Sequence, residues 1–176
     1  VQRVMPGMQA AFVDIGLERA AFLHANDVLR PGRVEDLAVG EPGATPVQSP
    51  AQPTPPIAEL LRDGQEVVVQ VVKDPIGTKG ARLTTQISIP SRYLVLLPQS
   101  KVIGVSARIE DEAERTRLKS LVGELALAGG HGYIVRTNAE GQPAEALAED
   151  IAYLRRAWEL VEQTAATAPV GSCVYE

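Results

Sequence analysis

Both phenylalanines of this chain fall on the polar faces of two short predicted strands. The stretch QAAFVDIGLERAAFLH, residues 9–24, predicts two strands joined by a turn at residues 16–19. Because side chains alternate along a strand, Phe12 shares a face with Asp14, and Phe22 shares a face with His24. The opposite faces are aliphatic: Ala11, Val13, Ile15, Ala21 and Leu23. Aromatic rings on the polar side of paired strands favour a stacking platform for unpaired bases. Alternatively, an insertion or a second layer covers the two rings, which then form a small satellite core. The alternation pattern does not decide between these two interpretations.

Positive charge gathers in one tract of an acidic chain. The 176 residues carry a formal net charge of −5, whereas residues 73–108 hold six basic residues and one acid, a local balance of +5 that leaves −10 for the remainder. The basic residues are Lys73, Lys79, Arg82, Arg92, Lys101 and Arg108. The overall charge argues against a generic basic nucleic-acid binder. The tract itself indicates either a confined anion-binding surface or a solvated face.

No pattern indicates a catalytic or metal site. The single cysteine, Cys173, and the two histidines, His24 and His131, do not make a zinc site, and one cysteine fits a reducing, cytoplasmic compartment. The loop GTKG at residues 77–80 lacks the spaced first glycine and the Lys-Ser/Thr pair of a phosphate-binding P-loop. No apolar run is long enough to span a membrane. The chain begins at Val1 without an initiator Met, so we expect a piece of a longer protein.

The elements that must position these residues change in type near residue 88. The first part predicts five short strands, at residues 1–5, 10–15, 20–24, 65–73 and 81–87, with a short helix at 57–62 before the fourth. This inventory is typical of a Greek-key OB-fold β-barrel. Residues 31–56 hold seven of the 13 prolines and predict a flexible loop.

The second part predicts a small α/β unit. Strands are expected at residues 93–97 and 133–137, and helices within 109–127 and from Pro143 to about Ala165. Asp111 and Glu114 have the spacing of a capping box at the start of the first helix. The second helix has an apolar stripe at Leu147, Ile151, Leu154, Trp158 and Val161. The Thr/Ala/Pro-rich segment after Gln163 is predicted to be a linker.

Five motifs stand in order along nearly the whole chain. They are PGMQAAFVDIG (6–16), KDPIGTKGARLTT (73–85), PSRYLVLLP (90–98), GVSARIE (104–110) and YIVRT (133–137). Together they resemble the ribonuclease E/G family, and GTKGARLTT with Pro90 before Ser91 is closer to its G-type branch. The resemblance implies an S1-type OB-fold RNA-binding domain at residues 1–87, a 5′-sensor α/β domain at 88–165, and a linker at 166–176 toward a catalytic domain that this chain lacks.

The resemblance also assigns candidate binding residues. Phe12 and Phe22 match the aromatics that hold single-stranded RNA, and Lys79 matches a lysine of the same surface. His24 is a further RNA-binding candidate that otherwise only packs at the strand end.

The 5′-phosphate pocket is assigned to Arg136, Thr137, Val95, Ser91 and Arg108. Ser91 stands where the E-type pattern has glycine, and Ala107 where it has arginine, so we expect fewer contacts with the phosphate. From the residues alone, Arg136 could instead form an ordinary surface ion pair.

The function implied by the resemblance is single-stranded RNA binding with 5′-monophosphate recognition. The resemblance implies that the chain is part of a Mg²⁺-dependent endoribonuclease of rRNA processing and mRNA decay. The residues that bind Mg²⁺, and those that link protomers through Zn²⁺ into a homo-oligomer, are expected beyond Glu176. We expect the isolated chain to bind RNA weakly and not to cleave it. Two rival hypotheses are a stand-alone S1-type RNA-binding module and a protein–protein scaffold whose acidic remainder repels RNA.

Overall fold

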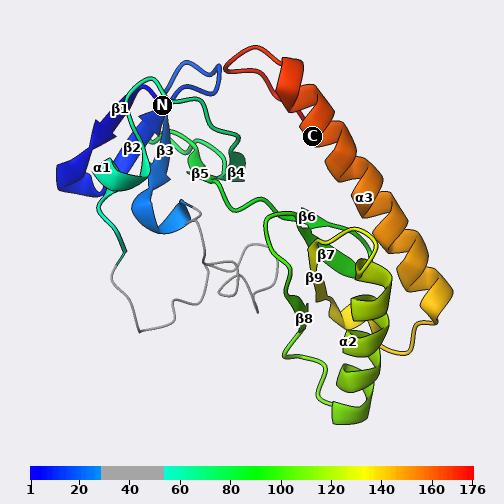
Figure 1. Ribbon diagram of the computed structural model, residues 1–176. Coiled ribbons are helices and arrows are strands. Elements are labelled where there is room, and N and C mark those ends of the chain that lie inside the picture. Colours follow the sequence, from blue (N-terminus) through cyan, green and yellow to red (C-terminus); the bar gives the residue numbers. More distant parts are fainter. Residues whose placement is uncertain (29–53) are drawn as a thin grey trace. The chain divides into compact units, whose positions relative to one another are not determined.

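The computed structural model describes residues 1–28 and 54–176, which form two β-sheets and helices α1 to α3 (Figure 1). The mixed α and β fold class predicted from the sequence is confirmed. The described residues divide into two compact units, one of residues 1–28, 54–87 and 161–176, and one of residues 88–160. The predicted flexible loop at 31–56 lies almost entirely outside the described residues.

The first unit contains a five-stranded sheet. Its strands are β1 (Arg3–Met5), β2 (Ala10–Val13), β3 (Ala21–His24), β4 (Gln70–Lys73) and β5 (Arg82–Thr84). Their order is β1-β2-β3-β5-β4, and neighbours are antiparallel except β3 and β5, which are parallel. The short helices of this unit are η1 (Pro6–Met8), η2 (Ala25–Asp27) and α1 (Ile57–Leu60). The Val1 nitrogen donates to the Gln65 carbonyl at 2.6 Å, and Gly64 N–H donates to the Val1 carbonyl at 2.8 Å.

The predicted alternation of β2 and β3 is confirmed by burial. Their aliphatic faces join α1 and β5 in one core, formed by Ala11, Val13, Ala21, Leu23, Ala25, Val28, Ile57, Leu61, Ala81 and Leu83. The strand predicted at residues 65–73 is shorter than expected and covers only Gln70–Lys73, because β5 pairs with this part alone. Val67 and Val69 nevertheless pack against the core.

Gly80 allows the chain to approach β3 very closely. A Cβ atom at position 80 would lie 2.1 Å from the carbonyl oxygen of Ala20, well inside van der Waals contact. One residue later, the Ala81 carbonyl accepts a hydrogen bond from Phe22 N–H at 2.7 Å. Glycine at position 80 therefore permits the parallel pairing of β3 with β5.

The last residues of the chain pack in the first unit. Helix α3 (Ala144–Thr167) continues beyond the predicted start of the linker, and a turn follows it. A Cβ on Gly16 would lie 2.2 Å from the Gly171 carbonyl oxygen, and both glycines have positive φ, 82° and 83°. The segment expected to be a linker is therefore in contact with the turn between β2 and β3.

The second unit contains a four-stranded sheet covered by helices. Its strands are β6 (Ile89–Pro90), β7 (Leu94–Leu97), β8 (Ile103–Val105) and β9 (Gly132–Val135), in the order β6-β7-β9-β8. β8 and β9 are parallel and are joined by α2 (Glu112–Ala126), which packs on both; η4 (Thr137–Ala139) follows β9. The predicted α3 stripe is buried at Leu147, Ile151, Leu154 and Val161, and Trp158 is half-buried. The sequence did not predict β6 or β8, which are two and three residues long.

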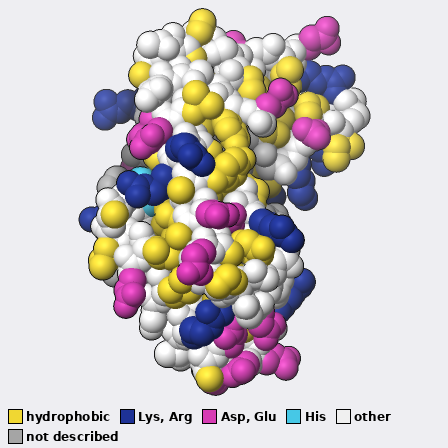
Figure 2. Space-filling view, turned by 90° about the vertical axis from the view of Figure 1, so that its right-hand side faces the viewer, with side chains coloured by type: hydrophobic (Ala, Val, Ile, Leu, Met, Phe, Trp, Pro, Cys, Tyr) yellow, Lys and Arg dark blue, Asp and Glu magenta, His cyan; other side chains and the backbone are white. Residues whose placement is uncertain are grey.

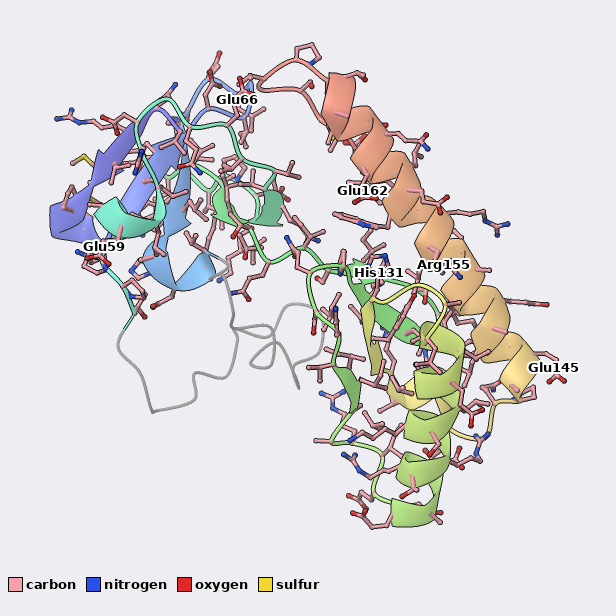
Figure 3. All side chains as sticks on the ribbon, in the orientation of Figure 1. Glu59, Glu66, His131, Glu145, Arg155 and Glu162 are labelled. Carbon is pink, nitrogen blue, oxygen red and sulfur yellow. The ribbon has the colours of Figure 1, made fainter. Side chains whose placement is uncertain are left out.

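Side chains of α3 reach the loop before β9. Arg155 leaves α3 on the side of His131 (Figure 3), and its Nε would lie 3.2 Å from a Cβ on Gly129. His131 Nδ1 lies 3.1 Å from the Pro98 carbonyl oxygen. The next strand buries Tyr133 completely, and burial raises the pKa of its phenol, whose oxygen has no hydrogen-bond partner within the described residues.

A charged network ties α2 to the loop before α3. Asp111 caps α2 by accepting from Ala113 N–H at 3.0 Å and Glu114 N–H at 3.4 Å. Glu114 does not complete the capping box; it accepts instead from Arg117 Nη2 at 2.5 Å and from Gly141 N–H at 2.8 Å. The hydrogen bonds from Arg117 and Gly141 lower the pKa of Glu114 from 4.5 to about 2.

Substituting Gly80→Ala should destabilise the first unit by about 1–3 kcal/mol, because the new methyl group overlaps the Ala20 carbonyl. Gly123→Ala is the matched control: a Cβ at this position in α2 meets nothing within 4 Å, and we expect a gain of up to about 1 kcal/mol. Chemical denaturation measures both. Equal stability of the two variants would contradict the close approach at position 80.

Substituting Glu114→Gln should lower the melting temperature at pH 7. Because the folded-state pKa is depressed, the ionised carboxylate stabilises the fold fully above pH 4.5 and loses this contribution as pH falls toward about 2. Thermal melts of wild type and variant from pH 7 to pH 2 should therefore converge. A difference that persists unchanged at pH 2 would show that the substitution acts through something other than this charge.

Candidate functional site

One residue from each strand of the first sheet lies in a single row across that sheet. Four successive registered pairs connect its members, and directly paired residues project from the same face. In spatial order the members are Arg3, Phe12, Phe22, Arg82 and Lys73. We call this set the cross-sheet row. Its neighbours along the inner strands, including Ala11, Leu23 and Leu83, are fully buried, so the row occupies the face opposite the core.

The centre of the cross-sheet row is aromatic. The rings of Phe12 and Phe22 meet edge to face, with centroids 6.3 Å apart and planes at 68°. Both rings are half-buried, so the described residues do not cover them as they would a core. Basic residues flank the two rings on both sides. Flat apolar surface between cations suits a chain that carries both bases and phosphates.

A β-bulge brings Lys73 into the row. Alternation alone would place Lys73 on the same face as Val71, which pairs with Leu83 of the core. The register shifts between Val71 and Lys73, so that Lys73 pairs with Arg82 instead.

Arg82 is held by a buried carboxylate. Asp27 Oδ2 accepts from Arg82 Nε at 3.3 Å and from Nη2 at 3.0 Å. Asp27 is 6% exposed, whereas the side chain of Arg82 is 37% exposed. The Asp27 carbonyl in turn accepts from Thr84 Oγ1 and Thr85 N–H, both at 3.0 Å. The guanidinium therefore has a fixed anchor beneath the row.

The other two RNA-binding candidates lie beside the row. His24 is 6.3 Å from the Phe22 ring, and its Nδ1 accepts from Asn26 N–H at 3.1 Å, which gives it a structural role as the cap of η2. Lys79 is exposed in a turn closed by its backbone bonds with Ile76. The Arg19 guanidinium donates to the Gly77 carbonyl of that turn and ties it to the β2–β3 connection.

In the second unit, four of the five candidate phosphate-binding residues lie at one edge of the sheet, and Val95 lies within β7. β8 and β9 are parallel, so their carboxyl ends lie at the same edge, where Arg108 and Arg136 follow them. β7 is antiparallel to β9 and therefore begins at this edge. The set comprises Ser91, Arg92, Arg108, Arg136 and Thr137, and we call it the edge cluster.

Arg136 is fixed against the turn before β7. Its backbone N–H donates to the Tyr93 carbonyl at 2.8 Å, and its Nη1 donates to the Ser91 carbonyl at 2.6 Å. Asp150 of α3 holds the same turn, since its Oδ2 accepts from Ser91 Oγ at 2.6 Å and Tyr93 N–H at 2.8 Å. The Ser91 hydroxyl is thus engaged by a carboxylate, which adds negative charge beside the cluster. Thr137 is the first residue of η4.

Val95 and Arg108 occupy different environments. Val95 is 2% exposed on the interior strand β7, between Pro90 and Ile134, so only its main chain could contribute to a site. Arg108 is exposed in the loop after β8. Arg115 of α2 holds that loop by donating to the carbonyls of Ser106 at 2.6 Å and Ile109 at 3.0 Å.

The sequence placed Lys73, Arg82 and Arg92 in the basic tract but did not assign them, or Arg3, to a particular site. Alternation could have placed Arg82 on the polar face of its strand, because it stands between the apolar residues Ala81 and Leu83. The bulge before Lys73 has no signature in the sequence. Arg92 lies 5.3 Å from the Tyr93 ring centroid. Its place in the edge cluster, like the anchoring role of Asp150, depends on tertiary structure.

Charge is mixed over the surface. The six residues of the basic tract are split between the units, with Lys73, Lys79 and Arg82 in the first. On the face shown in Figure 2, Lys and Arg side chains are interspersed with Asp and Glu. The described part of the chain contains no group of three or more His, Cys, Asp and Glu residues that could hold a metal ion. It also has no helix long and apolar enough to cross a membrane.

Comparisons with known proteins bear on both units. A family profile described as the ribonuclease E/G family matches residues 88–176. Ribonuclease G of Salmonella typhimurium (strain SL1344) is 55% identical over 161 residues, which are 92% of this chain and 31% of that protein. Ribonuclease G of Haemophilus influenzae is 49% identical over 99% of this chain and 34% of its own length. Ribonuclease E of Nostoc sp. is 43% identical over 94% of the chain and 22% of its own length. The chain thus spans about a third of the length of the ribonuclease G relatives.

Truncating Phe12→Ala should cost less stability than truncating Leu23→Ala, because Phe12 is half-buried outside the core and Leu23 is fully buried within it. We expect about 2–5 kcal/mol for Leu23→Ala and clearly less for Phe12→Ala. Urea denaturation of the two variants measures the difference. A loss at Phe12 as large as that at Leu23 would mean that the ring is part of a core.

Proposed function

Because the chain belongs to the ribonuclease E/G family, we propose that it binds single-stranded RNA and recognises its 5′-monophosphorylated end within a ribonuclease G/E-type endoribonuclease. Membership in this family associates the chain with RNA processing or decay. The observation that carries the RNA-binding part is the cross-sheet row, in which two partly exposed aromatic rings are flanked by cations.

The first unit is proposed to be an S1-type OB-fold barrel. The strand order β1-β2-β3-β5-β4, the parallel pairing of β3 with β5 and the short helix α1 before β4 support this assignment. The hydrogen bonds that join Val1 to Gly64 and Gln65 would bring the first and last strands of the order together. OB folds bind oligonucleotides across the face formed by strands 2 and 3, where Phe12 and Phe22 lie.

RNA would bind the row by stacking and charge together. Successive bases would stack on Phe12 and Phe22, at about 1–3 kcal/mol per base and without sequence preference. Arg3 and Lys73 at the ends of the row would contact the backbone, while Lys79 and His24 lie beside it. Such tolerance suits an enzyme that must accept many RNAs.

The edge cluster would bind the 5′-phosphate. Arg136 offers a planar guanidinium, already oriented by the Ser91 carbonyl, and Thr137 offers a hydroxyl next to it. Arg108 would add charge from the β8 loop, and the Val95 main chain would complete the wall. Asp150 beside Ser91 opposes an anion, so we expect a modest preference for the phosphorylated end.

Cleavage itself would be performed by other parts of the whole protein. Among the described residues, no group of three or more His, Cys, Asp and Glu side chains could hold a metal ion. The Mg²⁺-dependent catalytic domain, and the Zn²⁺ link through which the whole protein would form a homo-oligomer, would be supplied by residues outside this chain. The chain would then serve to position RNA for a reaction performed elsewhere.

The test is binding of one short single-stranded RNA with either a 5′-monophosphate or a 5′-hydroxyl, measured by fluorescence anisotropy. We expect Phe22→Ala to weaken binding of both RNAs by about 5- to 150-fold, because one stacking contact is lost. Arg136→Ala should remove the preference for the monophosphate and leave binding of the hydroxyl RNA nearly unchanged.

Arg156→Ala is the matched control, because it removes an exposed arginine of α3 outside the edge cluster. Absence of any preference for the monophosphate in the wild type would favour a stand-alone S1-type module. A protein scaffold would instead give no RNA binding and no dependence on salt concentration.

A further inference from the structure

Arg82 continues the aromatic part of the cross-sheet row onto the next strand. It pairs directly with Phe22 across the parallel β3–β5 pair, and neighbouring strands lie about 4.8 Å apart. Ala81 and Leu83 on either side of it are buried in the core, so Arg82 projects from the same face as the two rings. Its position is therefore the next one that a nucleotide crossing the strands would reach after Phe22.

The hydrogen bonds of Arg82 fix the edge of its guanidinium. Asp27 Oδ2 engages Nε and Nη2, which lie on one side of the planar group. Asp27 is buried and held through its carbonyl by two threonines, so this anchor has little freedom to move. An arginine held by one edge keeps its plane in a defined orientation and can present its face to a ligand.

The ion pair with Asp27 favours base stacking over phosphate binding by Arg82. The Asp27 carboxylate at 3.0 Å compensates the positive charge, which weakens any attraction for phosphate. The flat face is unaffected by that pairing, and Arg82 makes no cation–π contact with a ring of the described residues. Guanidinium planes are surfaces on which unpaired bases stack.

We propose that Arg82 is a third stacking position of the RNA surface, following Phe12 and Phe22, and that Asp27 is the residue that positions it. This inference rests on the proposed RNA binding of the first unit. The row then has three stacking positions in its centre, and Arg3 and Lys73 at its two ends remain for the phosphates.

The decisive variant is Arg82→Lys, which keeps the charge and a partner for Asp27 but removes the plane. We expect about a five-fold or larger loss of affinity for a ten-nucleotide, 5′-hydroxyl oligoadenosine, measured by fluorescence anisotropy. The slope of log affinity against log salt concentration should not change. By contrast, Lys73→Gln should reduce the magnitude of that slope by about 0.7, the value for one contact with a single-stranded phosphate.

Asp27→Ala tests the positioning role. Removal of the Asp27 carboxylate makes the net charge of the chain more positive. If Arg82 acted through its charge, this variant would bind RNA more tightly. If Arg82 acts as a stacking plane that Asp27 orients, the variant binds RNA more weakly. We expect weaker binding, and no further loss in the Asp27→Ala/Arg82→Lys double variant, because both changes remove the same contact. Circular dichroism melts show whether each variant is folded at the binding temperature, and Arg82→Lys, which retains the ion pair, carries the test if Asp27→Ala is unfolded.

The outcomes separate this inference from the function on which it rests. Wild-type affinity in Arg82→Lys, together with weakened binding in Phe22→Ala, overturns the stacking role and leaves RNA binding intact. Tighter RNA binding by folded Asp27→Ala also overturns it, in favour of a contact through charge. No RNA binding by the wild type overturns both.

Discussion

The parallel pairing of β3 with β5 is the constraint on which the first unit depends. It requires the backbone at Gly80 to touch the Ala20 carbonyl, a distance that no side chain allows. Only this pairing sets Arg82 opposite Phe22 and within reach of Asp27. Arg3, Phe12 and Phe22 come from the start of the chain, whereas Arg82 and Lys73 lie about 50 residues later, and the β3–β5 pairing joins the two parts of the row.

In the second unit, side chains hold the candidate site in place, whereas in the first unit a backbone contact does so. Its edge cluster lies on loops, which have no ladder to hold them. Asp150 fixes the turn before β7, and Arg115 fixes the loop after β8, each by hydrogen bonds to main-chain groups. Both sites therefore place an arginine against a rigid support. In each, a carboxylate close to the site limits the net positive charge.

Alternation along β2 and β3 was enough to predict the faces of Phe12 and Phe22, because period-two patterns depend only on local geometry. The long helix α3 and its buried stripe were predicted for the same reason, from the 3.6-residue period. The strands β6 and β8 were not predicted, since they are too short to have a period and form only by pairing with a buried neighbour. The bulge before Lys73 likewise belongs to the pairing of two strands.

The sequence identified the basic residues of the candidate sites, but it did not identify the acidic residues that orient them. The basic tract included Arg82 and Arg92. The residues that orient the sites are distant in sequence: Asp27 lies 55 residues from Arg82, and Asp150 lies 59 residues from Ser91. Contacts of this separation depend on how the strands are ordered. The resemblance to a family supplied Arg136 and Thr137, which no periodicity distinguishes.

The cross-sheet row has a consequence for how mutations act on it. Phe12, Phe22 and Arg82 each alternate with core residues of their own strand, and a slip of one strand by a single residue would exchange its two faces. Phe12 or Phe22 would then enter the core, and a core residue such as Leu23 would face the solvent. The energy that buries the core therefore also enforces the alignment of the RNA-facing side chains. Loss of that alignment would be detected first as loss of folding, well before it appeared as a change in which RNAs are bound.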